Sequence, residues 1–439
     1  MTSKKQLAFN LSSTFLRQVG ITVFQLAFTV LLARNLGKDN YGAYALALML
    51  PQLLMKILNL GLGSSVVYFL ARKELSIKNA IFKVVQLSAF TTVLALLADA
   101  IIIFLFGDTF FQNVPTNALI LASVLFPVLI LQELLPNIFL GLQKFSTYNV
   151  SYVVFPVFSL IIVWLMILFY NFDVTWALGA FGAGQFISIL TLLILLKREQ
   201  LREIDEVTSV SWSQLLSFSW KIHAANIVGF LNYRIDIFLV NFLANTATVG
   251  IYFIAVQIAE KLWLLSQAVN TAVFPHLSQK YKRSKLDTSA TEILGSTTFL
   301  LTILASIILT LCANAIIKTF FGEVFIEASV VLIYLLPGII ATSVGRILSN
   351  DFSARGEPQL NIYVGLFTVI SNVIANLYFI PKMGARGAAL ATSLSYGLSL
   401  IIKLFIYFQL VKVPFWRVLF PGKALIDIGK SIIANRKII

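Results

Sequence analysis

Ten charged side chains lie inside long apolar stretches of this 439-residue chain. A charge in the hydrocarbon core of a bilayer costs at least ~2.5 kcal/mol on insertion scales, so such residues tend to face protein or water and to be functional. The cations are Arg17, Lys56, Arg234, Lys261, Arg346 and Lys403, and the carboxylates are Asp99, Glu133, Asp236 and Glu260. Cations of this kind can bind phosphate, and carboxylates can pair with them or exchange protons.

The composition places these charges in a membrane. Hydrophobic residues make up 59% of the chain and charged residues 12%, whereas soluble proteins are about half apolar and a quarter charged. Runs of about 20 apolar residues predict twelve membrane-spanning helices. They cover residues 11–32, 43–70, 84–106, 118–140, 150–170, 176–196, 222–243, 251–274, 293–317, 330–348, 362–380 and 388–411. Pro51, Gly61 and Gly63 predict a kink or an interfacial extension in the second. With one cysteine and two histidines, we expect no disulfide, metal site or cofactor.

The basic residues of the connections predict the orientation. With the N-terminus in the cytoplasm, 22 Lys and Arg residues lie in inside segments and 5 in outside segments. The positive-inside rule therefore predicts that both termini are cytoplasmic. The net charge of +14 then needs no nucleic-acid partner, and attraction to lipid headgroups is secondary. The longest connections, 197–221 inside and 318–329 outside, are too short for a catalytic domain, so no enzyme is expected.

The loop at 197–221 divides the spans into six and six. Both halves then start in the cytoplasm, so a repeat would be parallel, with its axis along the membrane normal. Tyr41-Gly42 after the first span matches Val249-Gly250 after the seventh. We predict an all-α polytopic membrane protein with two six-helix bundles around a central cavity. The predicted parts are the bundle 1–196, the loop 197–221, the bundle 222–411 and the basic tail 412–439.

The depth of each charge predicts the polarity of that cavity. Four cations fall in the cytoplasmic half, with Glu133 as the acid there: Arg17, Lys56, Arg346 and Lys403. The interior should therefore be cationic where a substrate enters from the cytoplasm. Simpler interpretations remain for each residue: Arg17 and Lys403 could reach the headgroups, and Lys56 could lie in the interface. Asp99 and Glu133 are more easily explained as structural, paired across helices or protonated.

Two pairs of charges are harder to explain as structural. Arg234 and Asp236 are two residues apart and project to nearly opposite sides of a helix, so they cannot simply neutralise each other. Glu260 and Lys261 are about 100° apart around the next span. We predict that Arg234 and Lys261 face the substrate and that Asp236 or Glu260 titrates or pairs. Polar residues that could contact a sugar or headgroup, or simply join helices, are Gln18, Gln25, Asn232, Tyr233, Gln257 and Asn270.

Several motifs resemble those of a known family. The segments 232–236, 249–252, 257–263 and 274–275 are similar to the seventh and eighth helices of Wzx-type O-antigen and polysaccharide flippases. Further matches are 36–37 with 41–42, 336–338 with 345–346, and 380–389. The resemblance spans nearly the whole chain. It implies the multidrug/oligosaccharidyl-lipid/polysaccharide exporter superfamily.

The resemblance also implies a function. Such a protein of the bacterial inner membrane moves an undecaprenyl-diphosphate-linked oligosaccharide, an O-antigen, capsule or exopolysaccharide repeat unit, from the cytoplasmic to the outer leaflet. We expect alternating access coupled to ions rather than to ATP, and other polysaccharide-assembly membrane proteins as partners. The rival transport function is small-molecule antiport, which would favour a carboxylate-rich cavity. A polysaccharide polymerase would need a larger outer loop. A lipid II flippase is expected less because that branch usually has two further helices.

Overall fold

The computed structural model describes residues 4–111, 113–201, 209–267, 269 and 289–420, and every regular element within these ranges is a helix. Ten helical stretches are long and apolar enough to cross a membrane. The first, Gly20–Leu58, contains Gly37 at φ 70° and ψ 176°, so it joins the first two predicted spans across a kink. Helix α9 (Trp212–Leu243) covers the seventh predicted span but carries Arg234 and Asp236, and it is not among the ten. The predicted all-α polytopic class is confirmed.

The described chain forms two compact units, of which the first comprises Arg17–Gly250. Its helices are α1 (Lys4–Leu58), α2 (Leu62–Ala71), α3 (Ile77–Phe110), α4 (Thr116–Val124), α5 (Phe126–Leu134), α6 (Pro136–Gly141), α7 (Phe145–Phe169), α8 (Val174–Gln200) and α9. The fourth predicted span is divided into α4, α5 and α6, because Pro127 and Pro136 lack the amide hydrogen that a continuing helix requires and so occupy the first turns of new helices.

The second predicted span is also interrupted. Helix α1 ends at Leu58, and Leu60 and Gly61 then take positive φ values of 50° and 68° before α2 begins. A Cβ on Gly61 would lie 3.0 Å from side-chain atoms of both Ser219 and His223, so the turn needs glycine for its conformation and for its close approach to α9. Of the two predicted possibilities, a kink or an interfacial extension, the structure shows an interruption at Gly61, whereas Pro51 lies inside α1.

Helix α9 packs into the first unit through its N-terminal half. Ser65 Oγ donates to the Leu215 carbonyl at 2.5 Å, and His223 Nε2 hydrogen-bonds the Ile57 carbonyl at 3.0 Å. The rings of Tyr68 and Phe218 stack 4.2 Å apart. These contacts explain why α9 groups with the helices before it. The boundary predicted at residues 197–221 separates the two halves of the proposed repeat, and it stays a prediction. Residues 202–208 of that loop lie outside the described residues.

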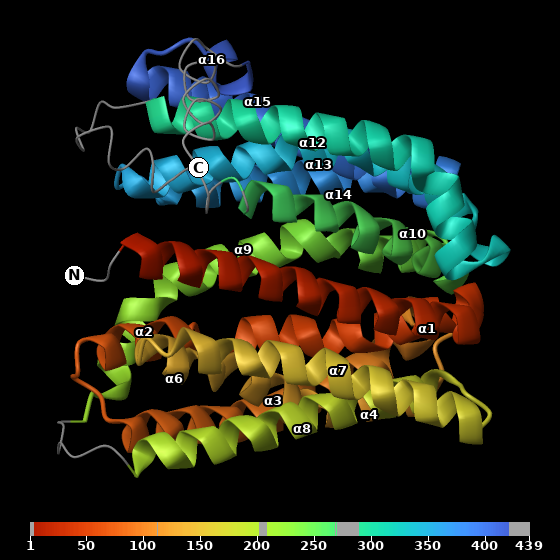
Figure 1. The fold of residues 1–439 in the computed structure, drawn as a ribbon. Coiled ribbons are helices and arrows are strands. Elements are labelled where there is room, and N and C mark those ends of the chain that lie inside the picture. The colour runs from red at the N-terminus through yellow and green to blue at the C-terminus, as the bar shows by residue number, and fades with distance from the viewer. Residues whose placement is uncertain (1–3, 112, 202–208, 268, 270–288, 421–439) are drawn as a thin grey trace. The chain divides into compact units, whose positions relative to one another are not determined.

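The second unit comprises Ile251–Ile439 with Met1–Leu16. Its elements are α10 (Thr246–Ala259), η1 (Glu260–Leu262), α12 (Ser289–Ile316), η2 (Ile317–Phe321), η3 (Glu323–Phe325), α13 (Glu327–Ala354), α14 (Gln359–Met383), α15 (Ala385–Val411) and α16 (Trp416–Leu419). Helices α12 to α15 run side by side (Figure 1). The predicted tail beyond residue 420 lies outside the described residues.

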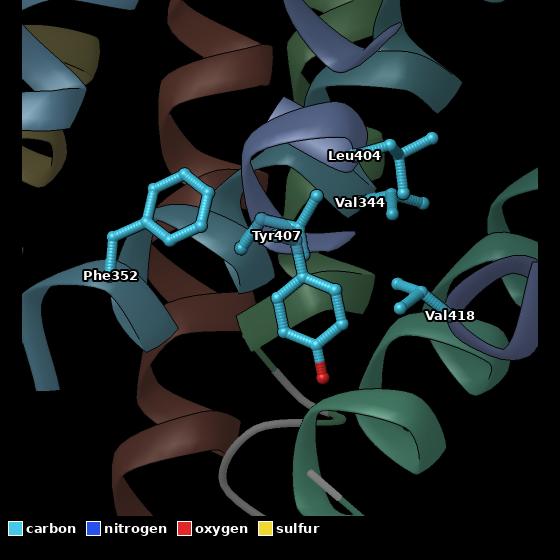
Figure 2. Packing of buried hydrophobic residues seen from close by; sticks show 6 residues of the cluster. Val344, Phe352, Leu404, Tyr407 and Val418 are labelled. Carbon is cyan, nitrogen blue, oxygen red and sulfur yellow. The ribbon is translucent and has the colours of Figure 1, made fainter. Parts of the chain in front are cut away.

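A buried apolar cluster holds α13, α15 and α16 together. Figure 2 shows Val344 and Phe352 of α13, Leu404 and Tyr407 of α15, and Val418 of α16 in this cluster, and each is at most 7% exposed. A Cβ on Gly295 of α12 would lie 2.6 Å from Val418, so α16 also packs closely on α12. Because dense packing holds side chains in fixed positions, the cluster sets the register of α13 against α15, where two predicted site cations lie.

Two glycines from the predicted repeat lie against each other's helices. An added Cβ on Gly42 would overlap the carbonyl of Thr246, four residues before Gly250, and one on Gly250 would overlap the carbonyl of Lys38, four residues before Gly42. The contact is therefore reciprocal, as a two-fold relation between the matching motifs requires. Only glycine allows the two backbones to approach this closely.

Candidate functional site

The second unit holds a cation on an aromatic surface. The guanidinium carbon of Arg346, in α13, lies 4.0 Å from the ring centroid of Trp263, which follows η1. A cation over an indole face is attracted by the ring quadrupole, by about 2 kcal/mol where water is excluded. A guanidinium has the geometry to donate to two phosphate oxygens at once.

Lys403 of α15 lies beside this pair. Its Nζ donates to Ser349 Oγ at 2.9 Å and to the Gly345 carbonyl at 3.4 Å, and both acceptors belong to α13. The two cations are close enough for their charges to repel. Within the described ranges, no carboxylate lies within ion-pair distance of Lys403. The half-buried ammonium is therefore held by neutral acceptors among the described residues.

Arg346, Lys403 and Trp263 thus form the candidate site, which we call the cationic site. Val344 and Leu348 flank Arg346 in sequence, and both are 0% exposed. Leu404 follows Lys403 directly and belongs to the same apolar cluster. A site on packed helices is more precise than one on loops. The arrangement places a planar donor beside a point charge, which suits a diphosphate.

In the first unit, the predicted cation Lys56 already has a partner. Its Nζ lies 2.5 Å from Glu133 Oε1, which joins α1 to α5, and the two side chains are 28% and 35% exposed. Since this pair is neutral, the predicted cationic excess of the cytoplasmic half rests on the cationic site and on Arg17. Arg17 lies in α1, and its side chain is outside the described residues.

Each of the two predicted site charges of α9 has a hydrogen bond with its own backbone. Arg234 is half-buried and its Nη1 donates to the Tyr233 carbonyl at 2.9 Å. Asp236 is 3% exposed and its Oδ1 accepts from the Ile237 amide at 2.9 Å. Asn232 and Tyr233 are half-buried beside them. The different burial of Arg234 and Asp236 agrees with their position on opposite faces of the helix, and the substrate role of Arg234 stays a prediction.

The remaining predicted residues are not part of the cationic site, although Glu260 and Lys261 lie in η1, shortly before Trp263. Glu260 and Lys261 are half-buried in η1, and Gln257 is half-buried one turn before them in α10. Gln18 is exposed on α1 and Gln25 is half-buried. Asn270 lies outside the described residues, so its predicted role stays a prediction. Asp99 is buried in α3 without an ion pair among the described side chains. None of these site roles is tested by the geometry alone.

Two features of the second unit were not predicted as site residues. Trp263 entered the sequence analysis only as part of a family motif, although a tryptophan two residues after a predicted intramembrane cation is a usable signal. The second is a buried polar cluster, in which Asn372 Nδ2 contacts Ser395 Oγ at 3.2 Å and Asn376 Nδ2 contacts Asn372 Oδ1 at 2.8 Å. Tyr252 Oη lies 3.2 Å from Thr392 Oγ1 nearby. These contacts join α10, α14 and α15.

The chain is similar to known proteins along most of its length. The family model described as "Lipid II flippase MurJ" matches residues 32–427. The protein named "Putative O-antigen transporter" of Shigella flexneri is 24% identical over 403 residues, which cover 87% of this chain and 93% of that protein. The "Probable low-salt glycan biosynthesis flippase Agl15" of Haloferax volcanii is 29% identical over 190 residues, or 43% of this chain, and the match spans only 40% of that relative.

Solved structures share the fold. The "Lipid II flippase MurJ, inward closed conformation" matches with a TM-score of 0.74 and 20% identity over 92% of this chain and 88% of that one. An inward-facing multidrug resistance MATE family transporter matches with a TM-score of 0.63 and 15% identity over 89% and 94%. At these identities the likeness concerns the fold. The family model and the full-length relative confirm the predicted superfamily and agree with the Wzx-type resemblance.

Proposed function

The chain belongs to the family described as lipid II flippase MurJ, and from this premise we propose that it flips an undecaprenyl-diphosphate-linked oligosaccharide from the cytoplasmic to the outer leaflet. The observation that carries the proposal is the half-buried ammonium of Lys403 beside Arg346, because no carboxylate among the described residues lies within ion-pair distance of Lys403. Such a site attracts an anionic headgroup. The names of the relatives, a glycan flippase and an O-antigen transporter, support a lipid-linked glycan.

The chemistry of the substrate matches the site. A diphosphate is anionic and a glycan is strongly hydrated, so neither crosses ~30 Å of hydrocarbon unaided. Arg346 supplies a fork of donors beside the Trp263 ring, and Lys403 supplies a point charge. The polyprenyl tail can stay in lipid while the headgroup moves. Only binding and movement are required, and no bond has to be made or broken.

Two other substrates are weighed against this one. A cationic drug would be repelled by the cationic site, although MATE transporters share the fold. Lipid II carries the same kind of diphosphate. The sequence predicts two helices fewer than lipid II flippases usually have, but the chain matches their family model, so helix number does not exclude lipid II as the substrate. We favour the oligosaccharide because relatives named for glycan export include one that aligns over 93% of its length.

We further propose cytoplasmic termini, an inner-membrane location and contacts with other polysaccharide-assembly proteins. The orientation rests on the excess of Lys and Arg in inside segments. Arg234, Lys261 and Arg17 are proposed as further contacts along the path of the headgroup, with polar neighbours such as Asn232 and Gln257 contacting sugars.

The experiment measures flipping in reconstituted vesicles that contain either an undecaprenyl-diphosphate oligosaccharide or lipid II. We expect Arg346→Ala and Lys403→Ala each to lower the initial rate at least tenfold, and Arg346→Lys to restore part of it. The matched control is Lys382→Ala, because Lys382 also lies on an aromatic ring, 3.4 Å from the Tyr378 centroid, but at the end of α14.

The control should flip at the wild-type rate. Equal loss in Lys382→Ala would mean that cation–ring pairs matter for folding rather than for substrate. Wild-type flipping of lipid II without flipping of the oligosaccharide would replace the proposed substrate by lipid II. Flipping of neither, in protein that is folded by its melting curve, would refute the function.

A further inference from the structure

A carboxyl group is buried in the first unit without a partner. Asp99 of α3 is 1% exposed, and neither of its carboxyl oxygens has a hydrogen-bond partner in the described chain. It lies 11 residues before Phe110, the end of α3, which places it about 16 Å along the helix axis from that end. A carboxylate at such a position would bear a large desolvation cost, because no cation pairs with it among the described residues.

The hydroxyl of Ser123 in α4 lies beside Asp99. Its proton is already used, because Ser123 Oγ donates to the Leu119 carbonyl at 3.0 Å. The lone pairs of Oγ therefore remain, and only a protonated carboxyl can donate to them. If Asp99 loses its proton, the serine hydroxyl can rotate away from Leu119 and donate to the carboxylate instead. The serine can serve both states of Asp99.

The charged groups of the neighbouring helices do not neutralise Asp99. Those with described side chains on α3 and the helices packed against it are Lys78, Lys83, Glu133, Lys197, Arg198, Glu199, His223, Arg234 and Asp236, with Tyr68 and Tyr233 as further titratable groups. Glu133 pairs with Lys56 and Glu199 with Lys144. Lys83 lies over the Trp212 ring, 4.7 Å from its centroid. None of these groups hydrogen-bonds Asp99.

We propose that Asp99 binds a proton in the conformation seen here and releases it when water reaches α3 in another conformation, so that proton movement drives the flipping cycle. The proton comes from water on one side of the membrane, forms an O–H bond on the carboxyl and returns to water on the other side. The coupling part rests on the proposed function. It places the coupling group on α3, whereas the sequence favoured Asp236 or Glu260.

Asp236 is less suited to this role. Its Oδ1 accepts the Ile237 amide, and a hydrogen bond from a backbone N–H stabilises the ionised form of a carboxyl. Asp99 has no such donor. The two buried carboxyls therefore differ in the property that proton binding requires.

The first test needs no substrate. Infrared difference spectra of the purified protein in lipid discs are recorded over a pH titration, and a protonated carboxyl is detected by its C=O stretching band. We expect one band that is lost in Asp99→Asn, is retained in Glu133→Gln and disappears at high pH. Absence of such a band in the wild type, or a band that no pH removes, would overturn the inference.

The second test measures flipping in vesicles with and without an imposed pH gradient. Asp99→Asn copies the neutral carboxyl in size and should keep its membrane abundance but lose at least nine-tenths of the gradient-driven acceleration. Ser123→Ala should keep the infrared band and lower the acceleration severalfold, because the ionised form loses its donor. Ser88→Ala is the matched control, since Ser88 is also buried in α3 without a partner among the described residues.

The two proposals fail in different ways. Full gradient dependence in Asp99→Asn refutes the coupling role even if flipping is normal. If the wild type flips no lipid-linked glycan but the Asp99 band titrates, the proposed function fails and the proton site stands.

Discussion

Replacing Lys403 by methionine should make the protein more stable and less active. The substitution removes a half-buried charge that has no carboxylate partner among the described residues. If Lys403 stabilised the fold, its replacement would lower the free energy of unfolding instead of raising it. A gain in stability together with a loss of flipping therefore identifies a charge that is retained for its ligand.

The magnitude follows from three contributions. Insertion scales assign about 2.5–3.5 kcal/mol to a lysine at a helix centre. Lys403 lies eight residues, about 12 Å, before the end of α15 at Val411, so the full value does not apply. Its hydrogen bonds to Ser349 and Gly345 return about 1 kcal/mol. The expected gain in the free energy of unfolding is about 1–2 kcal/mol, or roughly a 5- to 30-fold change in the folded ratio.

The same substitution at Lys56 should have the opposite effect. Lys56→Met leaves Glu133 without its partner, and breaking a fully buried pair costs 3–5 kcal/mol. Since these side chains are 28% and 35% exposed, water screens the remaining charge and we expect a loss of about 1–2 kcal/mol. Lys56→Met with Glu133→Gln should recover most of it.

The assay is reversible unfolding in lipid–detergent mixtures beside flipping in vesicles. Lys403→Met is expected to unfold at higher denaturant and to flip at least tenfold more slowly. A loss of stability as large as that of Lys56→Met would show that the Lys403 ammonium has a structural partner. Normal flipping by a stabilised Lys403→Met would remove Lys403 from the cationic site.

Three further outcomes are expected. Arg234→Ala should keep its membrane abundance by immunoblot but block surface-polysaccharide display, with Arg234→Lys partly active; normal display would exclude a substrate contact. Gly42→Ala should destabilise by at least about 1–3 kcal/mol, because the added methyl overlaps a backbone carbonyl that cannot rotate away, and Gly250→Ala should match it; a neutral Gly42→Ala would refute the reciprocal contact. Cysteine labelling should find loop 197–221 cytoplasmic and loop 107–117 external, and the reverse would overturn the orientation.

The helices could be predicted from the sequence because run length and hydropathy depend on single segments. Spans 176–196 and 388–411 fall within α8 and α15 for this reason. The interruptions were only partly visible. Gly61 signalled its break, whereas the division of span 118–140 needed knowledge of which prolines begin a new helix rather than kink an old one.

The pairings of side chains could not be predicted, because hydropathy does not fix how each helix is rotated. Lys56 and Glu133 were both recognised as intramembrane charges, but their 2.5 Å contact joins residues 77 positions apart. Arg346 and Lys403 were counted as separate cations of the cytoplasmic half. Their proximity depends on the register of α13 against α15, which the apolar cluster of Figure 2 sets.

Whether an intramembrane charge has a partner helps to distinguish structural charges from charges that we propose to bind substrate or a proton. In the first unit, Lys56 is paired across helices, and Asp99 can avoid its charge by binding a proton. In the second unit, Lys403 has no carboxylate to pair with among the described residues. Its neighbours there are Arg346, a hydroxyl and a carbonyl. A buried cation of this kind is costly unless an anion arrives. The diphosphate is therefore expected to be held by the second unit, while the proton is bound by the first.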